Sequence, residues 1–307
     1  MSRRRDGVVA SPRPPAVAGA FYPTDPDELA ELVDGLLATA LPPDEASAAV
    51  QAAGLAGILV PHAGLAYSGR VAAVAWHLAA SLVRDGEPWA MTIVMLGTNH
   101  RAAWLDGVGI WDAGAWRTPL GDVEVDEDLA AEIAALGPPF AVDRDAHSSE
   151  HSLEVQLPIV QRALPGVRIV PLAIGTGTGE PAVRAGERLG ALLAERRARG
   201  VRIGVAISTD MAHYPPAAVA ARITAELAPL ILALEPLGLA RREADVTRSG
   251  LPGVACGMCG IEPTVLGLAA LRSMGVERGV RLAAASSADA GGPSGRTVGY
   301  LAAAFPG

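Results

Sequence analysis

The chain has 307 residues, half of them hydrophobic, which is enough to bury a sizeable core. Its formal net charge of −8 excludes nucleic acid as the main partner, because phosphate binding requires concentrated positive charge. Lysine is absent, so the sequence also excludes a Schiff-base lysine and a Walker A phosphate loop. No uninterrupted apolar run reaches the roughly eighteen residues of a membrane-spanning helix, so we expect no membrane association.

The start of the chain differs in character from the rest. Residues 1–14 predict a disordered leader that lacks the apolar core of a signal peptide. Residues 15–307 contain no linker and no internal repeat, and they predict a single domain in a cytoplasmic protein. The two cysteines, Cys256 and Cys259, are too few for a disulfide framework.

Apolar runs alternate with amphipathic stretches along the chain. In chain order we expect helix 26–37, strand 57–60, helix 69–83, strand 92–96, helices 127–136 and 150–164, strand 167–173, helix 181–197, strand 201–207, helices 217–234 and 263–273, and strands 280–285 and 297–304. This order is typical of βαβ units, and it predicts an α/β fold with a central, mostly parallel β-sheet flanked by helices on both faces. Segment 105–125 has short alternating runs and glycine turns, and it predicts a small antiparallel hairpin inserted after the second strand.

Polar residues gather at the ends of the expected strands. His62 follows one strand and His100 another, while Asp210 and His213 follow a third. The carboxyl ends of parallel strands meet at one edge of a sheet, where ligands bind in such folds. We therefore expect these side chains to share one cleft.

Two neutral imidazoles and one anionic group make a good site for a divalent metal. Spacing alone leaves the anionic ligand open among four candidates, which are Asp210, Glu154, Glu262 and a cysteine thiolate. The segment "ACGMCGIEP" is itself open to several interpretations: a redox pair, half of a structural zinc site, a single thiolate ligand, or two inert buried cysteines.

Seven motifs in order resemble the Memo family, whose prokaryotic members are called AmmeMemoRadiSam system protein B. They are "PPAVAGAFYP", "PHAGLAYSG", "LGTNH", "W-x-TPLG", "EHSLEVQLP", "STDMAHY" and "CG-x-x-P", spread over residues 15–305. The family is similar in fold to the class III (LigB-type) extradiol dioxygenases. Those enzymes hold Fe(II) with two histidines and a glutamate, and in the Memo family a cysteine replaces the glutamate.

The resemblance implies a ligand set for this chain. The metal ligands would be His62 of "PHAG", His100 of "GTNH" and Cys259, which fits the Cys-Gly-x-x-Pro pattern where Cys256 does not. His213 would act as the catalytic acid or base, and Asp210 would hold it. Residues that orient these groups would be His151, Glu154 and Asn99.

The leading hypothesis is a protein that binds one iron or copper ion. Fe(II) is the expected ion, with copper or zinc as alternatives, and the activity would be redox or dioxygenase-like chemistry on a substrate that the sequence does not identify. A second hypothesis is a non-enzymatic module that recognises a peptide or protein in a cleft walled by Trp111, Trp116 and Tyr67. Under either hypothesis we expect a small-molecule or peptide ligand in the cleft. The family name implies an AMMECR-domain protein and a radical SAM enzyme as partners. Metal-assisted hydrolysis is a third hypothesis.

Overall fold

The computed structural model describes residues 11–82 and 90–307. Most of the expected leader, residues 1–10, lies outside the described residues. Arg13 falls within the range expected to be a leader, yet its side chain is buried and paired with Glu154. The folded part of the chain therefore includes Arg13.

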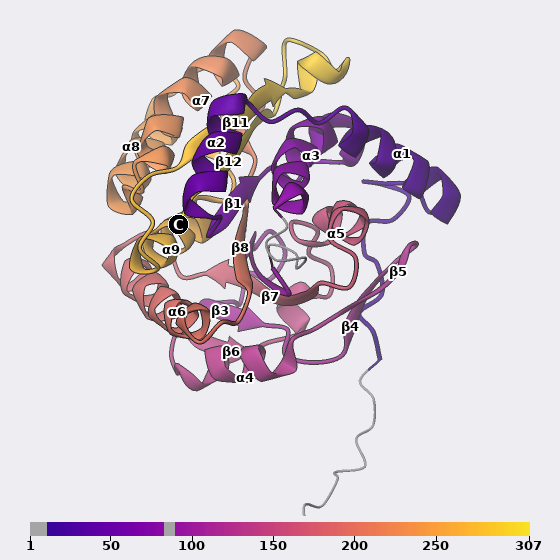
Figure 1. The fold of residues 1–307 in the computed structure, drawn as a ribbon. Helices are drawn as coiled ribbons and strands as arrows, with labels where there is room; N and C mark the ends of the chain where they lie inside the picture. Colours follow the sequence, from indigo (N-terminus) through magenta and orange to yellow (C-terminus); the bar gives the residue numbers. More distant parts are fainter. Residues whose placement is uncertain (1–10, 83–89) are drawn as a thin grey trace, which may run out of the picture.

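A central sheet forms the middle layer of the molecule (Figure 1). Within the described residues it has eight strands, in the order β11 (Val280–Ser286), β12 (Gly299–Phe305), β1 (Gly57–Val60), β8 (Ile203–Ser208), β2 (Thr92–Thr98), β7 (Arg168–Gly175), β3 (Gly107–Ile110) and β6 (Phe140–Val142). The four middle strands, β1, β8, β2 and β7, are parallel and almost wholly buried. β12 runs antiparallel to both neighbours, and β3 runs antiparallel to β7. The predicted α/β class with a mostly parallel sheet is confirmed.

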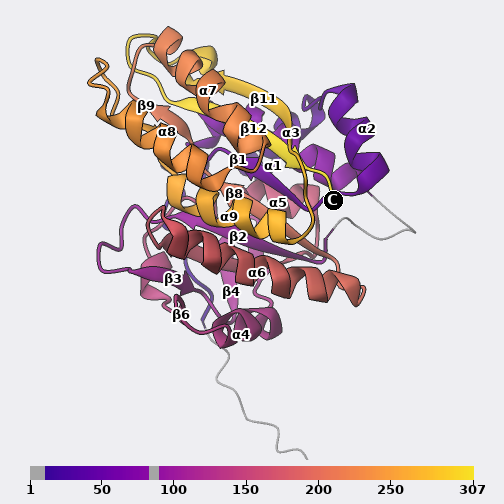
Figure 2. The same cartoon turned by 90° about the vertical axis from the view of Figure 1, so that its left-hand side faces the viewer.

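Helices cover both faces of this sheet (Figures 1 and 2). One face packs against α6 (Glu180–Ala198), α7 (Ala217–Leu232), α8 (Pro236–Arg248) and α9 (Ile261–Ser273). The other carries α1 (Pro26–Ala38), α3 (Leu65–Ser81) and α5 (Leu157–Ala163). α2 (Asp44–Ala53) and α4 (Glu127–Ala135) lie at the periphery (Figure 2). No described helix combines the length and apolar character needed to cross a membrane.

The inserted segment after β2 only partly matches its prediction. Its second half forms the expected antiparallel hairpin, β4 (Ala115–Thr118) with β5 (Gly121–Glu124). Its first half, however, is β3, which joins the central sheet beside β7. Two short strands, β9 (Met211–His213) and β10 (Cys256–Met258), pair with each other and were not predicted. Three residues are too few to show a strand periodicity.

The helix expected over 150–164 begins later than predicted. The structure has a 3₁₀ turn, η2 (Glu154–Gln156), followed by α5 from Leu157. The Glu150 carboxylate accepts hydrogen bonds from the backbone N–H groups of His151 and Ser152, at 2.8 and 2.9 Å. These bonds hold the backbone in a local turn, which competes with helix formation. Two further 3₁₀ turns are η1 (Asp145–His147) and η3 (Ser287–Ala290).

Trp111 and Trp116, expected in the wall of a cleft, lie in the interior. They are 8% and 0% exposed, and their rings contact each other and the ring of His147. That expectation is therefore wrong for both tryptophans. Burial lowers the pKa of His147 to about 4, although its bond to the Gly109 carbonyl works in the opposite direction. His147 is therefore neutral in the folded protein at moderate pH.

His147→Gln is expected to make the metal-free protein less sensitive to acid. The unfolded chain protonates His147 below about pH 6.5, whereas the folded chain resists this down to about pH 4. The stability contributed by the neutral ring is therefore complete above pH 6.5 and is lost as the pH falls toward 4. Between pH 6.5 and 4.5 the unfolding free energy should fall by about 2 kcal/mol less in the variant than in wild type. Urea unfolding at several pH values measures this, with His77→Gln on α3 as control. Parallel curves for wild type and His147→Gln would contradict it.

Candidate metal centre

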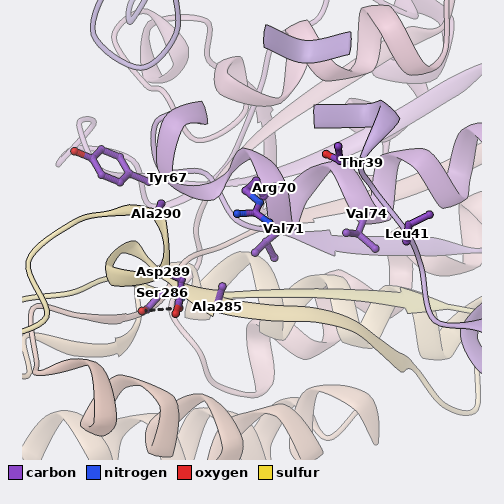
Figure 3. Close-up of a pocket in the computed structure, with 10 residues that line it drawn as sticks. All are labelled: Thr39, Leu41, Tyr67, Arg70, Val71, Val74, Ala285, Ser286, Asp289 and Ala290. Atoms are coloured by element: carbon purple, nitrogen blue, oxygen red, sulfur yellow. Dashed lines mark hydrogen bonds between the residues drawn. The ribbon is translucent and has the colours of Figure 1, made fainter. Parts of the chain in front are cut away.

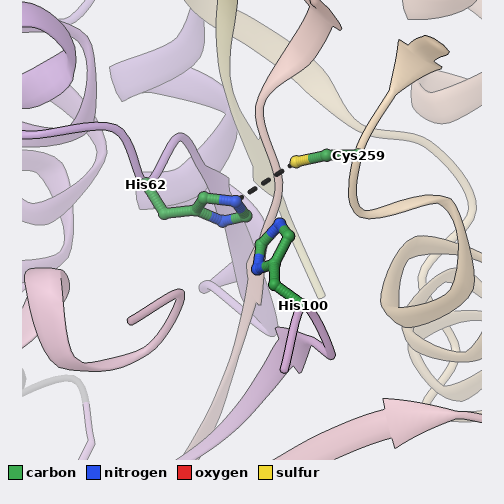
Figure 4. Close-up of side chains that lie close together, drawn as sticks. All are labelled: His62, His100 and Cys259. Atoms are coloured by element: carbon green, nitrogen blue, oxygen red, sulfur yellow. Dashed lines mark hydrogen bonds between the residues drawn. The ribbon is translucent and has the colours of Figure 1, made fainter. Parts of the chain in front are cut away.

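Three side chains converge at the carboxyl edge of the central sheet (Figure 4). His62 follows β1 and His100 follows β2, and these strands flank β8 in the sheet. Cys259 follows β10, which pairs with β9, the short strand just after β8. One ligand atom from each of the three residues lies within 4.8 Å of the other two. Both histidines therefore lie close together, as expected for residues that follow parallel strands whose carboxyl ends share one edge of the sheet.

Hydrogen bonds fix which nitrogen of His62 faces the cysteine. The Ser208 hydroxyl donates to the Ser152 carbonyl at 2.7 Å, so it accepts from His62 Nδ1–H at 2.9 Å. The other ring nitrogen, Nε2, then carries a lone pair, and it lies 3.2 Å from Cys259 Sγ. His62 is thus held as the tautomer that a metal ligand requires.

His100 is held in the same way by Glu150. Its Nδ1–H donates to Glu150 Oε1 at 2.9 Å, and its backbone N–H donates to Oε2 at 2.7 Å. Burial alone would raise the pKa of Glu150, but the bonds from His100 and Ser152 outweigh it and lower the pKa to about 2. An ionised carboxylate can only accept, so Nδ1 keeps its proton and Nε2 is left free. This is the carboxylate–histidine arrangement found behind metal ligands.

Close backbone packing sets the position of Cys259. Its N–H donates to the Asp210 carbonyl at 3.2 Å, and Gly260 N–H donates to Thr209 Oγ1 at 3.0 Å. A Cβ on Gly260 would lie 2.5 Å from Thr209 Cβ and 2.8 Å from Thr98 Oγ1. Only glycine allows this approach, which explains why the cysteine is followed by glycine.

Burial keeps His62 and Cys259 uncharged in the absence of a cation. It lowers the pKa of His62 well below its usual value, and the neighbouring His100 and His151 add to this. It raises the pKa of the Cys259 thiol well above its usual value, and Asp210 raises it further. A bound cation reverses the preference of the thiol, because it stabilises the thiolate directly.

The donor set fits a metal ion. Two imidazole nitrogens have their outer partners in place and lone pairs directed inward, and a thiol stands beside them. The His100 side chain is 26% exposed, so one side of the cluster is open to solvent. Three protein ligands with an open position are typical of a reactive metal site rather than a closed structural one.

His151 and His213 lie beside the three candidate ligands. The His151 ring is 4.6 Å from that of His100 and 5.5 Å from that of His62, between centroids. Burial lowers the pKa of each to about 4. His213 Nε2 is buried and has no hydrogen-bond partner, whereas His151 Nδ1, also without a hydrogen bond, lies 3.3 Å from Glu150 Oε1. Both rings are therefore neutral, and His213 Nε2 is available to a ligand.

The other residues expected at the site have clear contacts. Asp210 accepts a hydrogen bond from His62 N–H at 2.7 Å, and burial raises its pKa to about 7 despite the bonds from the His62 and Ala63 amides. Asn99 stabilises its own loop: its side-chain amide makes two hydrogen bonds of 2.8 Å with the backbone of Ala102. Glu154 instead contacts the N-terminal segment, where it pairs with Arg13 and accepts from Tyr22 OH. It does not orient a candidate ligand.

Cys256 lies apart from the cluster. It begins β10, opposite His213 in the register. Of the two cysteines, Cys259 alone belongs to a candidate metal group among the described residues. Both cysteines are free in this structure. Cys256 is therefore not one of the candidate ligands, and it is not disulfide-bonded to Cys259 in this conformation.

Comparisons with known proteins agree over almost the whole chain. The model of the Memo-like protein family matches residues 13–304. A MEMO1 family protein of Methanopyrus kandleri is 35% identical over 295 residues, covering 95% of this chain and 98% of that protein. The chain belongs to the Memo-like family.

Other members of the Memo-like family are similar to a comparable degree. The MEMO1 family protein of Methanothermobacter thermautotrophicus is 34% identical, over 94% of this chain and 98% of its own. That of Aquifex aeolicus is 35% identical, over 95% and 98%. A solved structure of an uncharacterized protein from Escherichia coli K12 aligns with a TM-score of 0.47 and 16% identity, over 81% of this chain and 99% of that one.

Sequence reasoning missed two residues of this Memo-like site. Glu150 lies within the motif "EHSLE", but the sequence led us to expect that Glu154 of the same motif orients the metal ligands. Ser208 ends β8 and gives no sign in sequence of its contact with His62. Glu150 had one detectable signal, since it directly precedes a histidine in a histidine-rich turn.

Proposed function

We propose that this Memo-like protein binds one iron or copper ion through His62, His100 and Cys259, with Fe(II) as the expected ion. The observation that carries the proposal is the pair of outer hydrogen bonds that His62 and His100 donate to Ser208 and Glu150, which leave both imidazoles with a free nitrogen beside the thiol. A soft thiolate with two imidazoles suits copper, zinc or a readily oxidised iron. The bound ion would supply electron transfer in redox or dioxygenase-like chemistry.

The chain's own residues would handle protons around the bound substrate. His213 is neutral and its Nε2 is unpaired, so it can accept a proton from an acidic ligand group. Asp210 would contribute by fixing the backbone of His62. His151 stacks against His100 and has its Nδ1 3.3 Å from Glu150 Oε1, so it would help to shape the site on the side of His100. A substrate with an ionisable hydroxyl suits these groups.

Elemental analysis of untagged protein purified without oxygen tests the proposal. We expect about one equivalent of iron or copper in wild type, little in Cys259→Ser, and the wild-type amount in the matched control Cys256→Ser. Thermal unfolding of the metal-free proteins checks that each variant folds. Full metal content in both Cys259→Ser and His62→Ala would contradict the proposal. If zinc is the only metal bound to wild type, metal-assisted hydrolysis becomes the favoured function.

Partners are proposed on the resemblance alone. An AMMECR-domain protein and a radical SAM enzyme would act beside this protein, in the cytoplasm. The alternative function is a peptide-binding module at the same cleft. It has less support, because Trp111 and Trp116, two of the three residues expected to line the cleft, are buried in the core.

A further inference from the structure

The backbone is strained at Tyr214, the residue that directly follows His213 and the end of β9. Tyr214 has a φ of 73°, in the left-handed region that residues other than glycine rarely adopt. Its N–H donates to the Thr297 carbonyl at 2.6 Å, and the N–H and hydroxyl of Thr297 each donate to the Pro215 carbonyl at 2.9 Å. Backbone strain persists where such contacts fix it, and it is concentrated at functional sites.

The strained residue carries an aromatic ring that lies between His213 and an arginine. The Tyr214 ring is 5.4 Å from the His213 ring, between centroids, and the two rings meet edge to face. The Arg296 guanidinium lies over the same Tyr214 ring, 4.4 Å from its centre. The Tyr214 side chain is 43% exposed, so packing in the core does not account for this arrangement. A single ring thus separates the His213 imidazole from the Arg296 guanidinium.

Arg296 has a positive charge that no carboxylate of the described chain neutralises. Its side chain is exposed and forms no ion pair among residues 11–82 and 90–307. Stacking on an aromatic ring holds a guanidinium in one orientation and leaves its N–H groups free to bind a carboxylate. On the other side of Tyr214, His213 Nε2 is buried and has no hydrogen-bond partner. Both groups can therefore bind a ligand.

We propose that Arg296 binds a carboxylate of the substrate and that Tyr214 is the positioning residue for Arg296. The substrate is a hydroxy acid: its hydroxyl lies beside His213 Nε2, its carboxylate meets Arg296, and a spacer about the size of one aromatic ring joins the two. The hydroxyl end rests on the proposed function, because it lies at the metal centre. The carboxylate end does not depend on a bound metal.

Arg70 provides a matched control arginine elsewhere on the surface. It is exposed on α3, also without an ion-pair partner in the described part of the chain. Figure 3 shows it at a groove of about 310 Å³ between α3 and the end of β11. Neither Tyr214 nor His213 lines this groove. Arg70→Gln therefore removes an equivalent charge without touching the Tyr214–Arg296 pair.

Calorimetric titration with three rigid probes tests the carboxylate contact. The probes are 4-hydroxybenzoate, its neutral analogue 4-hydroxybenzamide, and benzoate, which lacks the hydroxyl. We expect the zinc-loaded wild type to bind 4-hydroxybenzoate at least about fivefold more tightly than 4-hydroxybenzamide. Arg296→Gln should abolish this preference, whereas Arg70→Gln should leave it unchanged. In metal-free protein, benzoate should still bind more weakly to Arg296→Gln than to wild type.

Variants of Tyr214 distinguish positioning from a purely structural role. Tyr214→Phe keeps the ring under Arg296, so it should retain the preference for 4-hydroxybenzoate. Tyr214→Gly and Tyr214→Ala should both lose it. Urea unfolding should nevertheless show that Tyr214→Gly is more stable than Tyr214→Ala, because glycine adopts a positive φ without strain. Loss of the preference in Tyr214→Phe as well would contradict the positioning role.

Two outcomes would overturn the carboxylate contact itself. The first is equal binding of 4-hydroxybenzoate and 4-hydroxybenzamide to wild type, or a preference that survives in Arg296→Gln. The second is the absence of binding by all three probes. Metal analysis of the same samples separates this test from that of the proposed function. A wild type that takes up no metal contradicts the metal centre, while benzoate binding to the metal-free protein still decides the role of Arg296.

Discussion

Arg13→Met is expected to lower the free energy of unfolding by about 3–5 kcal/mol, because it leaves the Glu154 carboxylate buried without its cation. The two side chains are 1% and 0% exposed and lie 2.6 Å apart, between Nη1 and Oε2. Glu154 also accepts from the Tyr22 hydroxyl at 2.6 Å and from the amides of Ala16 and Val17 at 2.7 and 2.9 Å. Methionine is similar in length to arginine and fills most of the same volume. The loss of stability therefore measures the missing charge and hydrogen bonds rather than a cavity.

The loss should extend beyond the ion pair itself. Arg13 donates to the carbonyls of His147 and Glu150, at 2.8 and 2.6 Å, and its guanidinium lies 4.1 Å from the centre of the Trp116 ring. Through these bonds it ties the start of the fold to the turn that carries Glu150. We therefore expect Arg13→Met to loosen the turn beside His100 as well.

Urea unfolding of a matched set measures this prediction. The exposed pair Arg162–Asp34 serves as control, with side chains 44% and 50% exposed, and Arg162→Met should cost at most about 1 kcal/mol. The double variant Arg13→Met/Glu154→Gln should recover part of the loss, since it removes the unpaired charge. A loss below about 1 kcal/mol for Arg13→Met would show that Glu154 protonates or finds water instead.

The arrangement of strands explains why much of the fold was predictable from sequence. The middle strands are buried on both faces, so each appears in sequence as a continuous apolar run, as in 92–96 and 203–207. Helices that cover such a sheet show one apolar stripe, which marked α1, α6 and α7. β9 and β10 lack either signal because they are three residues long and depend on each other for pairing.

The candidate ligands were predictable for a related reason, and their supporting residues were not. His62 and His100 follow apolar runs directly, so the parallel topology alone brings them to one edge. The choice of Cys259 over Cys256 came from the family pattern, and the structure places Cys259 beside His62. Glu154 was assigned to the site, yet its cation is Arg13, 141 positions away in a segment expected to be disordered. Such a long-range buried pair leaves no local pattern in the sequence.

Glu150→Gln is expected to weaken metal binding about 10- to 100-fold, which is the usual effect of removing a carboxylate behind a histidine ligand. Both Glu150 oxygens accept: Oε1 from His100 Nδ1–H and the amides of His151 and Ser152, and Oε2 from His100 N–H. A glutamine must replace one oxygen with an NH₂ group, so a donor would face a donor. The His100 ring would then lose its fixed tautomer and the negative charge that strengthens it as a ligand.

Chelator competition under anaerobic conditions measures the affinity, and nitrogen NMR of the imidazoles reports the His100 tautomer. Glu262→Gln is the matched control, because that carboxylate lies at the same sheet edge but bonds to Gly177 N–H at 3.1 Å. If Glu150 orients His100, the variant should show both weaker binding and a mixture of tautomers while the control shows neither. Weaker binding with an unchanged tautomer would assign the effect to charge alone. Unchanged affinity would show that Glu150 plays no part in metal binding. The orientation of the His100 ring would then depend on its stacking against His151 instead.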